Sequence, residues 1–324
     1  MWAGADTLAG RVLVGVWARV AIMDEPFSAY CKLGIVHFMA FGACMKGDGP
    51  IVETVMSLAA DPDFEVIEVG HINDPAARRQ VRAVADEAGV ELAYAAQPTV
   101  LLNKLDPNSL DSSVRQRAVD ALRAELDLAC EMDAIGFGFL SGPDPGEAHR
   151  LAAVGALVES CGQLCEHAGG LGDFPVLLET FDRDVDKRAL VGPNSVGAEI
   201  AVRLDRDNFG LMIDLSHLPL QGESVGEALA AAGSHLKHAH MGNCFLARQD
   251  DSAYGDQHPR FGYPGSEIGV PELSEYLRGL KEVGYLNRQK RSVVSFEVKP
   301  AAGERAELVI ANAKRTLREA WLRV

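Results

Sequence analysis

The chain has 324 residues, of which 48% are hydrophobic, so it is long enough to bury one large core or two smaller ones. Its formal net charge of −15 argues against nucleic-acid binding, because an acidic surface repels phosphate backbones. The six cysteines contain no C-x-x-C pair, which is typical of reduced thiols in a cytoplasmic protein.

The first 31 residues are predicted to be an extension outside the main fold. Residues 11–23 are apolar, but this run is too short to span a bilayer and is interrupted by Arg19. Asp6 precedes it and no clean small-residue cleavage site follows, which argues against a signal peptide. We therefore expect an extension at 1–31, or a start site placed too early, and one domain at 32–324 with no membrane attachment.

Apolar runs that read as strands recur along the remaining chain, and helical patterns alternate with them. The eight predicted strands cover residues 32–41, 64–70, 90–98, 134–142, 174–180, 209–214, 235–242 and 292–300. Helices are predicted near residues 50–60, 74–89, 109–134, 149–170 and 303–324. The helix at 149–170 ends in Gly-Gly, a common C-terminal stop signal.

Eight strands alternating with helices predict an α/β fold, a closed parallel (β/α)8 TIM barrel. The strands are near-continuous apolar runs, as expected when helices cover the sheet and side chains fill its interior. A doubly wound open sheet is the alternative, but no Gly-rich phosphate loop follows any predicted strand. The polar segment 243–270 is long for a loop, so we expect it to be functional or disordered.

Side chains that commonly bind metals stand at the carboxyl ends of four consecutive predicted strands. They are Glu179, Asp214, His240 and Glu297. Because strand ends meet at one mouth of a parallel barrel, we expect these groups to converge. Three adjacent carboxylates repel one another, and a divalent cation relieves that repulsion. Oxygen ligands with one imidazole favour Mn²⁺ or Mg²⁺, with Co²⁺ also compatible. Singly, each residue has a structural explanation, but together they favour a metal site.

Two histidines close to this quartet have predicted supporting roles. His217 follows Asp214 by three residues and can reach a substrate oxygen, although a cap on the loop backbone is an equal alternative. His238 lies two residues before His240, so both side chains point the same way on a strand. We assign His238 to support His240 rather than to bind the metal.

Three further residues are candidates for substrate binding. His258 and Arg260 lie in the long 243–270 segment, where Arg260 can clamp a hydroxyl or a carboxylate. A solvated arginine is the more usual case in such a loop. His37 points either into the barrel or toward the helices, and it is the weakest of these candidates.

The order of Glu179, then D-x-x-H at residues 214–217, then His240 and Glu297 resembles the sugar isomerase/epimerase barrels related to xylose isomerase. The gap from Asp214 to His240 is similar to that of ketose 3-epimerases. The resemblance covers residues 32–324 and implies that the quartet binds one metal. It also implies that Glu179 and Glu297 transfer the proton beside a sugar carbonyl. Residues 1–31 and the long loop depart from a plain epimerase.

A narrower resemblance is carried by "LGIVHFMAF", "KGDGPIVETV", "ETFDRDVDKRALVGP" and "YGDQHPRFG". These stretches are similar to the larger, catalytic subunit of C-glycoside deglycosidases, which cleave the carbon–carbon bond of a 3-oxo-glucoside with a small partner subunit. That lyase chemistry needs a second acid, for which His217 or a loop histidine is available. The resemblance implies an oligomeric cytoplasmic sugar lyase, with a ketose 3-epimerase or sugar isomerase as the alternative.

Two other classes fit the sequence less well. Apurinic-site endonucleases share this barrel, but they need several metals, many more histidine ligands and a basic groove for DNA. A barrel retained only as a binding or scaffold subunit is the non-enzymatic alternative. Loss of Glu179 or Glu297 would have suggested it, and both residues are present.

Overall fold

A computed structural model describes residues 25–172 and 174–324 of the chain. Residues 1–24, and with them the apolar run at 11–23, lie outside the described residues. The rest of the predicted extension forms a short 3-10 turn, η1 (Phe27–Ala29), that packs on the barrel. The ring of Phe27 meets that of Trp321 edge-on, with 5.2 Å between the ring centroids. The described part of the predicted extension is thus in contact with the main fold.

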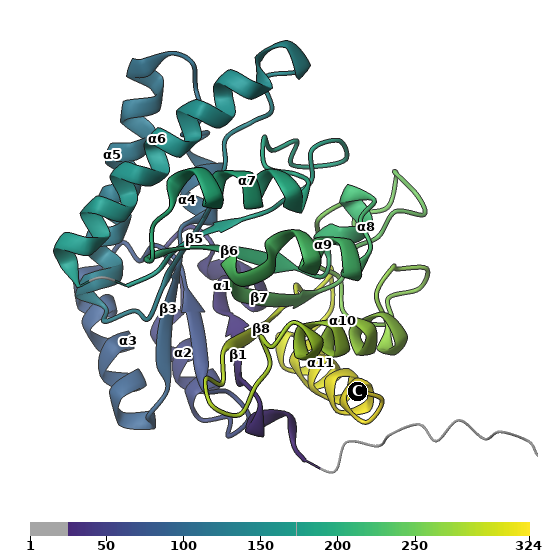
Figure 1. The fold of residues 1–324 in the computed structure, drawn as a ribbon. Coiled ribbons are helices and arrows are strands. Elements are labelled where there is room, and N and C mark those ends of the chain that lie inside the picture. Colours follow the sequence, from purple (N-terminus) through teal and green to yellow (C-terminus); the bar gives the residue numbers. More distant parts are fainter. Residues whose placement is uncertain (1–24, 173) are drawn as a thin grey trace, which may run out of the picture.

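Eight parallel strands close into a barrel in chain order, with the first strand hydrogen-bonded to the last. Figure 1 shows the strands in the middle of the molecule and the helices outside them. The strands are β1 (Lys32–Val36), β2 (Val66–Val69), β3 (Glu91–Ala95), β4 (Phe137–Leu140), β5 (Val176–Glu179), β6 (Phe209–Asp214), β7 (Leu236–Gly242) and β8 (Val293–Glu297). The predicted single-domain (β/α)8 barrel is confirmed, and the open sheet is excluded.

The helices alternate with these strands and vary widely in length. They are α1 (His37–Ala40), α2 (Ile51–Ala59), α3 (Pro75–Ala88), α4 (Gln97–Leu102), α5 (Ser112–Glu131), α6 (Glu147–Leu171), α7 (Asn194–Leu204), α8 (His217–Gln221), α9 (Val225–Ala232), α10 (Val270–Glu282) and α11 (Ala306–Trp321). Two further 3-10 turns are η2 (Gly42–Cys44) and η3 (Gly233–His235).

Two predicted strands run on into short helices at their carboxyl ends. The run 32–41 leaves the sheet after Val36, and His37 begins the short helix α1. The run 90–98 likewise leaves the sheet after Ala95, and Gln97 begins α4. The first residues of both helices are buried, so they continue the buried run of the strand without a change that periodicity can detect.

Local signals fix where several helices begin. Asp74 accepts a hydrogen bond from the backbone N–H of Ala76 at the start of α3, and Asp111 caps α5 in the same way. Ser224 and Glu227 form a reciprocal capping box on α9. These caps satisfy backbone donors that have no partner inside the helix, so they define the loop-to-helix transitions around the barrel.

The strand register brings polar side chains to one level at the carboxyl mouth of the barrel. Asp214, the last residue of β6, lies opposite His240 of β7. Glu297, the last residue of β8, lies opposite Gly242. A Cβ atom on Gly242 would stand 2.8 Å from Asp214 Oδ2, so only glycine leaves room for that carboxylate. The register therefore creates the polar cluster described below.

All six cysteines lie in the described residues and are free thiols. Among the described helices, none combines the length and the apolar character needed to cross a bilayer.

We predict that Gly34→Ala destabilises the barrel by about 1–3 kcal/mol, because inserted core atoms force neighbours aside. The new Cβ atom would lie 2.1 Å from Ser295 Oγ on the adjacent strand β8. Gly155→Ala is the matched control, because its Cβ atom would meet only the end of Arg203 at 3.6 Å. Urea unfolding of both variants measures the difference, and equal stabilities would contradict this packing argument.

Candidate metal centre

The four predicted strand-end residues converge on one point. One potential ligand atom from each of Glu179, Asp214, His240 and Glu297 lies within 4.8 Å of the others. His240 Nδ1 is 2.8 Å from Glu297 Oε2 and 3.6 Å from Glu179 Oε1. The side chains of Glu179, Asp214 and His240 are at most 2% exposed, whereas that of Glu297 is 12% exposed. The cluster is therefore nearly closed to solvent, with Glu297 at its more open side.

Two of these carboxylates each have one oxygen held by the protein and one without a partner. Gln97 donates to Glu179 Oε2 at 2.7 Å, which leaves the buried Glu179 Oε1 without a hydrogen bond. The backbone N–H groups of Ser216 and Gly242 donate to Asp214 Oδ1 at 2.7 and 3.0 Å, and Asp214 Oδ2 has no partner.

Buried carboxylate oxygens without partners are costly, and a divalent cation satisfies such oxygens directly. The unpartnered Glu179 Oε1 faces His240 Nδ1 at 3.6 Å, and Asp214 belongs to the same four-residue cluster. The donor set therefore fits a divalent metal that prefers oxygen ligands and accepts one imidazole.

A carboxylate that sequence reasoning missed, Glu68, contacts the second ring nitrogen of His240. Both oxygens of Glu68, on β2, lie 3.2 Å from His240 Nε2, and Glu68 Oε1 is also 2.7 Å from His238 Nε2. With Nε2 of His240 directed at Glu68, Nδ1 is the atom left to face the cluster. Histidines that bind metals commonly have such a carboxylate on the second ring nitrogen. The sequence signal was a lone glutamate inside the apolar strand "VIEV".

Burial and neighbouring charges shift the pKa values in opposite senses within the cluster. Burial raises the pKa of Asp214, and the Glu297 carboxylate adds to this rise. Burial by itself would lower the pKa of His240, but the Glu68, Glu179 and Glu297 carboxylates raise it well above its ordinary value. Without a bound cation, His240 is therefore an imidazolium with a proton on each ring nitrogen. The proton on Nδ1 must leave before that nitrogen can act as a ligand.

Two of the predicted substrate-binding histidines lie beside this cluster. His217 is fully buried at the start of α8, and its Nδ1 donates to the Thr180 carbonyl at 2.7 Å. His258 comes from the long loop, with Nε2 3.5 Å from Glu297 Oε1 and Nδ1 3.7 Å from Asp214 Oδ2. His217, His258 and Asp214 also present ligand-type atoms within 4.8 Å of one another. Sequence reasoning missed Asp256, which lies between the two rings.

The structure does not bring the other two candidates into the cluster. Arg260 donates through Nε to Glu304 Oε1 at 2.8 Å and through Nη1 to the Gly262 carbonyl at 3.0 Å. His37 is hydrogen-bonded to Thr54 Oγ1 of α2 at 2.7 Å, and burial lowers its pKa to about 4. His37 is thus hydrogen-bonded within the first β/α unit, away from the four-residue cluster.

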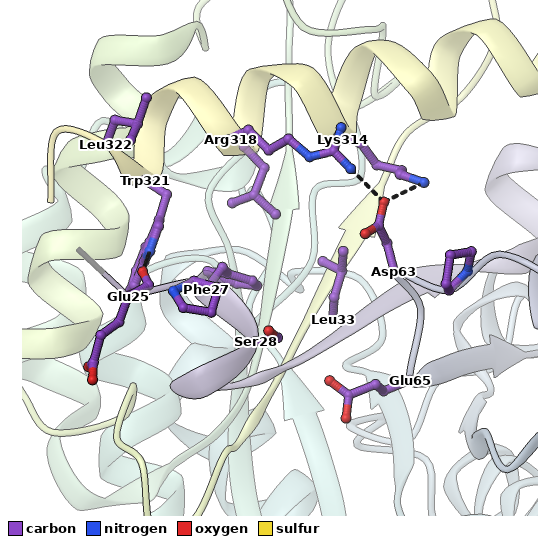
Figure 2. Close-up of a pocket in the computed structure, with 13 residues that line it drawn as sticks. Glu25, Phe27, Ser28, Leu33, Asp63, Glu65, Lys314, Arg318, Trp321 and Leu322 are labelled. Carbon is purple, nitrogen blue, oxygen red and sulfur yellow. Dashed lines mark hydrogen bonds and ion pairs between the residues drawn. The ribbon is translucent and has the colours of Figure 1, made fainter. Parts of the chain in front are cut away.

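A cavity of about 570 Å³ opens at the opposite, amino-terminal end of the barrel, between η1 and α11 (Figure 2). Its charged groups satisfy one another, since Asp63 lies between Lys314 and Arg318 at 2.6 and 2.8 Å. Residues at that end of a (β/α)8 barrel contribute mainly to stability. The cluster of ligand-type side chains lies at the other end, at the carboxyl mouth of the barrel.

Comparisons with known proteins agree with this geometry. The family model described as "Xylose isomerase-like TIM barrel" matches residues 56–320. D-psicose 3-epimerase from Ruminiclostridium cellulolyticum is 32% identical over 88 residues, which are 27% of this chain and 29% of that protein. The aligned part therefore spans under a third of that relative's length.

Two solved structures share the fold across almost the whole chain. D-psicose 3-epimerase from Clostridium cellulolyticum H10, with D-tagatose, is 20% identical, covers 90% of this chain and 96% of its own, and has a TM-score of 0.63. The 3-keto-D-glucoside 4-epimerase from E. coli is 16% identical, covers 90% of this chain and 99% of its own, and has a TM-score of 0.62. At these identities the similarity extends to the fold alone.

We predict that Glu68→Gln weakens divalent-metal binding by about 10–100-fold, because the support of His240 loses its charge. Titration calorimetry with Mn²⁺ measures the change. Glu91→Gln is the matched control, since Glu91 begins β3 at the far end of the barrel and pairs with Lys32. Equal affinities for wild type and Glu68→Gln would contradict a role for Glu68 in the metal centre.

Metal binding is also expected to release a proton from His240. The folded-state pKa of His240 is raised, so the competing proton is bound at low pH and is lost as the pH rises through that pKa. Metal affinity should therefore increase with pH, by about tenfold per pH unit for each proton displaced. Calorimetry in buffers of different ionisation enthalpy counts the protons. Affinity that is flat from pH 6 to 8, with no proton release, would refute this exchange.

Proposed function

This chain belongs to the xylose isomerase-like TIM-barrel family, and from that premise we propose that it is a divalent-metal-dependent sugar epimerase. In this proposal the enzyme removes a proton from the carbon beside a carbonyl and returns one to the opposite face. The single observation that carries the proposal is the pair of glutamates, Glu179 and Glu297, from strands β5 and β8 at one cluster of ligand-type atoms.

In this proposal all four residues of the cluster would hold the cation, and the two glutamates would also move a proton. A bound divalent cation supplies a Lewis acid that polarises the sugar carbonyl and stabilises the charge left when the α-proton departs. Glu179 and Glu297 approach from different strands, so one carboxylate can take the proton while the other returns it. Gln97 donates to Oε2 of Glu179 and so fixes the orientation of that carboxylate.

The surroundings of the cluster support chemistry away from bulk water. The 243–269 loop covers the mouth, and its His258 is 2% exposed. Water exclusion strengthens the electrostatic interactions that stabilise developing charge. Mn²⁺ is our proposed native metal, with Mg²⁺ or Co²⁺ as alternatives, because the donor set is rich in oxygen.

The substrate in this proposal is a ketose or a keto-glycoside. A 3-epimerase for D-psicose matches part of the sequence, and epimerases for D-psicose and a 3-keto-D-glucoside share the fold. Both named activities exchange configuration at a carbon of a sugar that carries a carbonyl. The same cluster chemistry serves either substrate, so side chains of the loops select between them.

One observation favours a second candidate, the C-glycoside deglycosidase reaction on a 3-oxo-glucoside. His258 adds a second buried acid–base group beside Glu297, at 3.5 Å. Cleavage of a bond β to the carbonyl requires an acid that protonates the departing carbon, a role that a plain epimerase does not need. A small partner subunit and an oligomeric state belong to this candidate, and co-purification from cells tests both.

The expected result of incubation in D₂O separates the two candidates. With a panel of ketoses, the proposed epimerase incorporates deuterium at the carbon beside the carbonyl and forms the epimer. Exhaustive chelation abolishes the exchange, and Mn²⁺ restores it. Release of an aglycone from a 3-oxo-C-glucoside would instead establish the lyase. Exchange that survives complete metal removal, or no exchange with any sugar, would refute the proposal.

Replacement of either proton-transfer glutamate should reduce turnover far more than metal binding. We expect Glu179→Gln and Glu297→Gln each to lower kcat by roughly 10²–10⁴-fold, as is typical for loss of a general base. The variant that lacks the abstracting base should lose solvent exchange, whereas the other can still exchange without forming product. Glu125→Gln is a buried control, because Glu125 bonds Tyr94 and His71 outside the cluster. Near-normal turnover of both metal-loaded variants would show that the pair is not catalytic.

A further inference from the structure

The tip of the 243–269 loop places one carboxylate between the two histidines of the site. Asp256 Oδ1 lies 2.8 Å from His258 Nε2 and 3.1 Å from His217 Nε2. Its other oxygen, Oδ2, is 3.1 Å from Lys187 Nζ. The side chain of Asp256 is only 2% exposed, and its Oδ1 lies at ion-pair distance from both rings without forming a hydrogen bond of good geometry. One buried carboxylate thus touches residues from the β5–α7 loop, from α8 and from its own loop.

The position of Asp256 is itself fixed by the loop that follows β5. Asp186 Oδ2 accepts the backbone N–H of Asp256 at 3.1 Å and the side-chain amide of Gln257 at 3.3 Å. Lys187 Nζ bonds Asp186 Oδ2 at 2.9 Å and the Asp256 carbonyl at 3.2 Å. Two neighbouring residues, Asp186 and Lys187, therefore hold both the backbone and the side chain of the loop tip.

The backbone of His258 adopts a strained conformation. Its φ angle is +50°, in the left-handed region that costs a non-glycine residue free energy. The Lys299 N–H donates to the His258 carbonyl at 2.8 Å and fixes that conformation from the end of β8. Strained conformations of this kind persist only where the surroundings enforce them, and they concentrate at functional sites.

The rings of His217 and His258 face Asp256 with the same nitrogen, Nε2. Nδ1 of His217 is already committed to the Thr180 carbonyl, and Nδ1 of His258 lies 3.4 Å from Ser216 Oγ. In both rings the nitrogen that remains, Nε2, is the one near Asp256. Rotation of either ring would break a contact at each of its nitrogens, so Asp256 completes the restraint of both.

We propose that Asp256, held by Lys187, is a positioning residue that fixes the ring orientations of His217 and His258 beside the metal cluster. The long loop would then contribute to the reaction through this carboxylate, as well as by covering the site. The activity measurements below rest on the proposed function, whereas the spectroscopic and metal measurements do not.

The test compares Asp256→Asn with Asp251→Asn in the full-length, Mg²⁺-loaded chain. Asp251 lies in the same loop and bonds Arg248 and Tyr263, so it controls for general loop damage. Asp256→Asn should lower kcat by about 10–100-fold while KM changes little, as for other groups that orient a functional side chain. Asp251→Asn should leave kcat unchanged.

Two readouts separate positioning from simple destabilisation. Imidazole ¹⁵N signals of His217 and His258 should shift in Asp256→Asn, while the metal content per chain stays that of the wild type. Lys187→Met should reproduce part of the loss in kcat, and Lys187→Arg should recover most of it, because the arginine keeps the charge beside Asp256.

Three results would overturn the inference. These are an unchanged kcat in Asp256→Asn, unshifted imidazole signals, or a metal content below that of the wild type, which would make Asp256 a metal ligand. If the wild type turns over no sugar, the proposed function fails, but the imidazole signals still decide the role of Asp256.

Discussion

Repulsion among three carboxylates at one end of the barrel is the constraint on which the rest of this structure depends. Glu179, Asp214 and Glu297 converge with little solvent to screen their charges, and burial raises the pKa of Asp214. The hydrogen bond from His240 to Glu297 relieves part of that repulsion with one proton. A divalent cation relieves more of it, because it contacts several oxygens at once. The unpartnered oxygens of Glu179 and Asp214 are the local sign that the protein leaves this place for a cation.

The whole barrel contributes to holding these charges together. The quartet comes from β5 to β8, but the groups that orient it come largely from elsewhere. Glu68 on β2 reaches across the interior to His240, and Gln97 at the start of α4 fixes Glu179. Such supporting contacts decide which ring nitrogen and which carboxylate oxygen face the centre. A closed barrel makes this possible, because strands distant in sequence surround one interior.

The fold and the quartet could be predicted from the sequence because each leaves a local signal. Apolar runs mark the strands, and a polar residue at the end of such a run marks the mouth of the barrel. Glu68 is marked only as a lone glutamate inside an apolar strand, and nothing local points to its partner His238, which is 170 residues away in the chain. The positions of loop side chains are equally difficult to predict from the sequence. His258 and Arg260 are two residues apart, yet one enters the site and the other pairs with Glu304. That difference depends on a left-handed backbone at His258, which composition does not reveal.

The central claim is that the quartet binds one divalent cation, and anomalous diffraction from Mn²⁺-soaked crystals tests it most directly. The account predicts one strong anomalous peak within about 2.5 Å of Glu179 Oε1, Asp214 Oδ2, His240 Nδ1 and a Glu297 oxygen. The hydrogen bond between His240 and Glu297 should then be replaced by contacts to the ion. A crystal with Mn²⁺ in the solution, no peak at this position and the His240–Glu297 hydrogen bond intact would contradict the account.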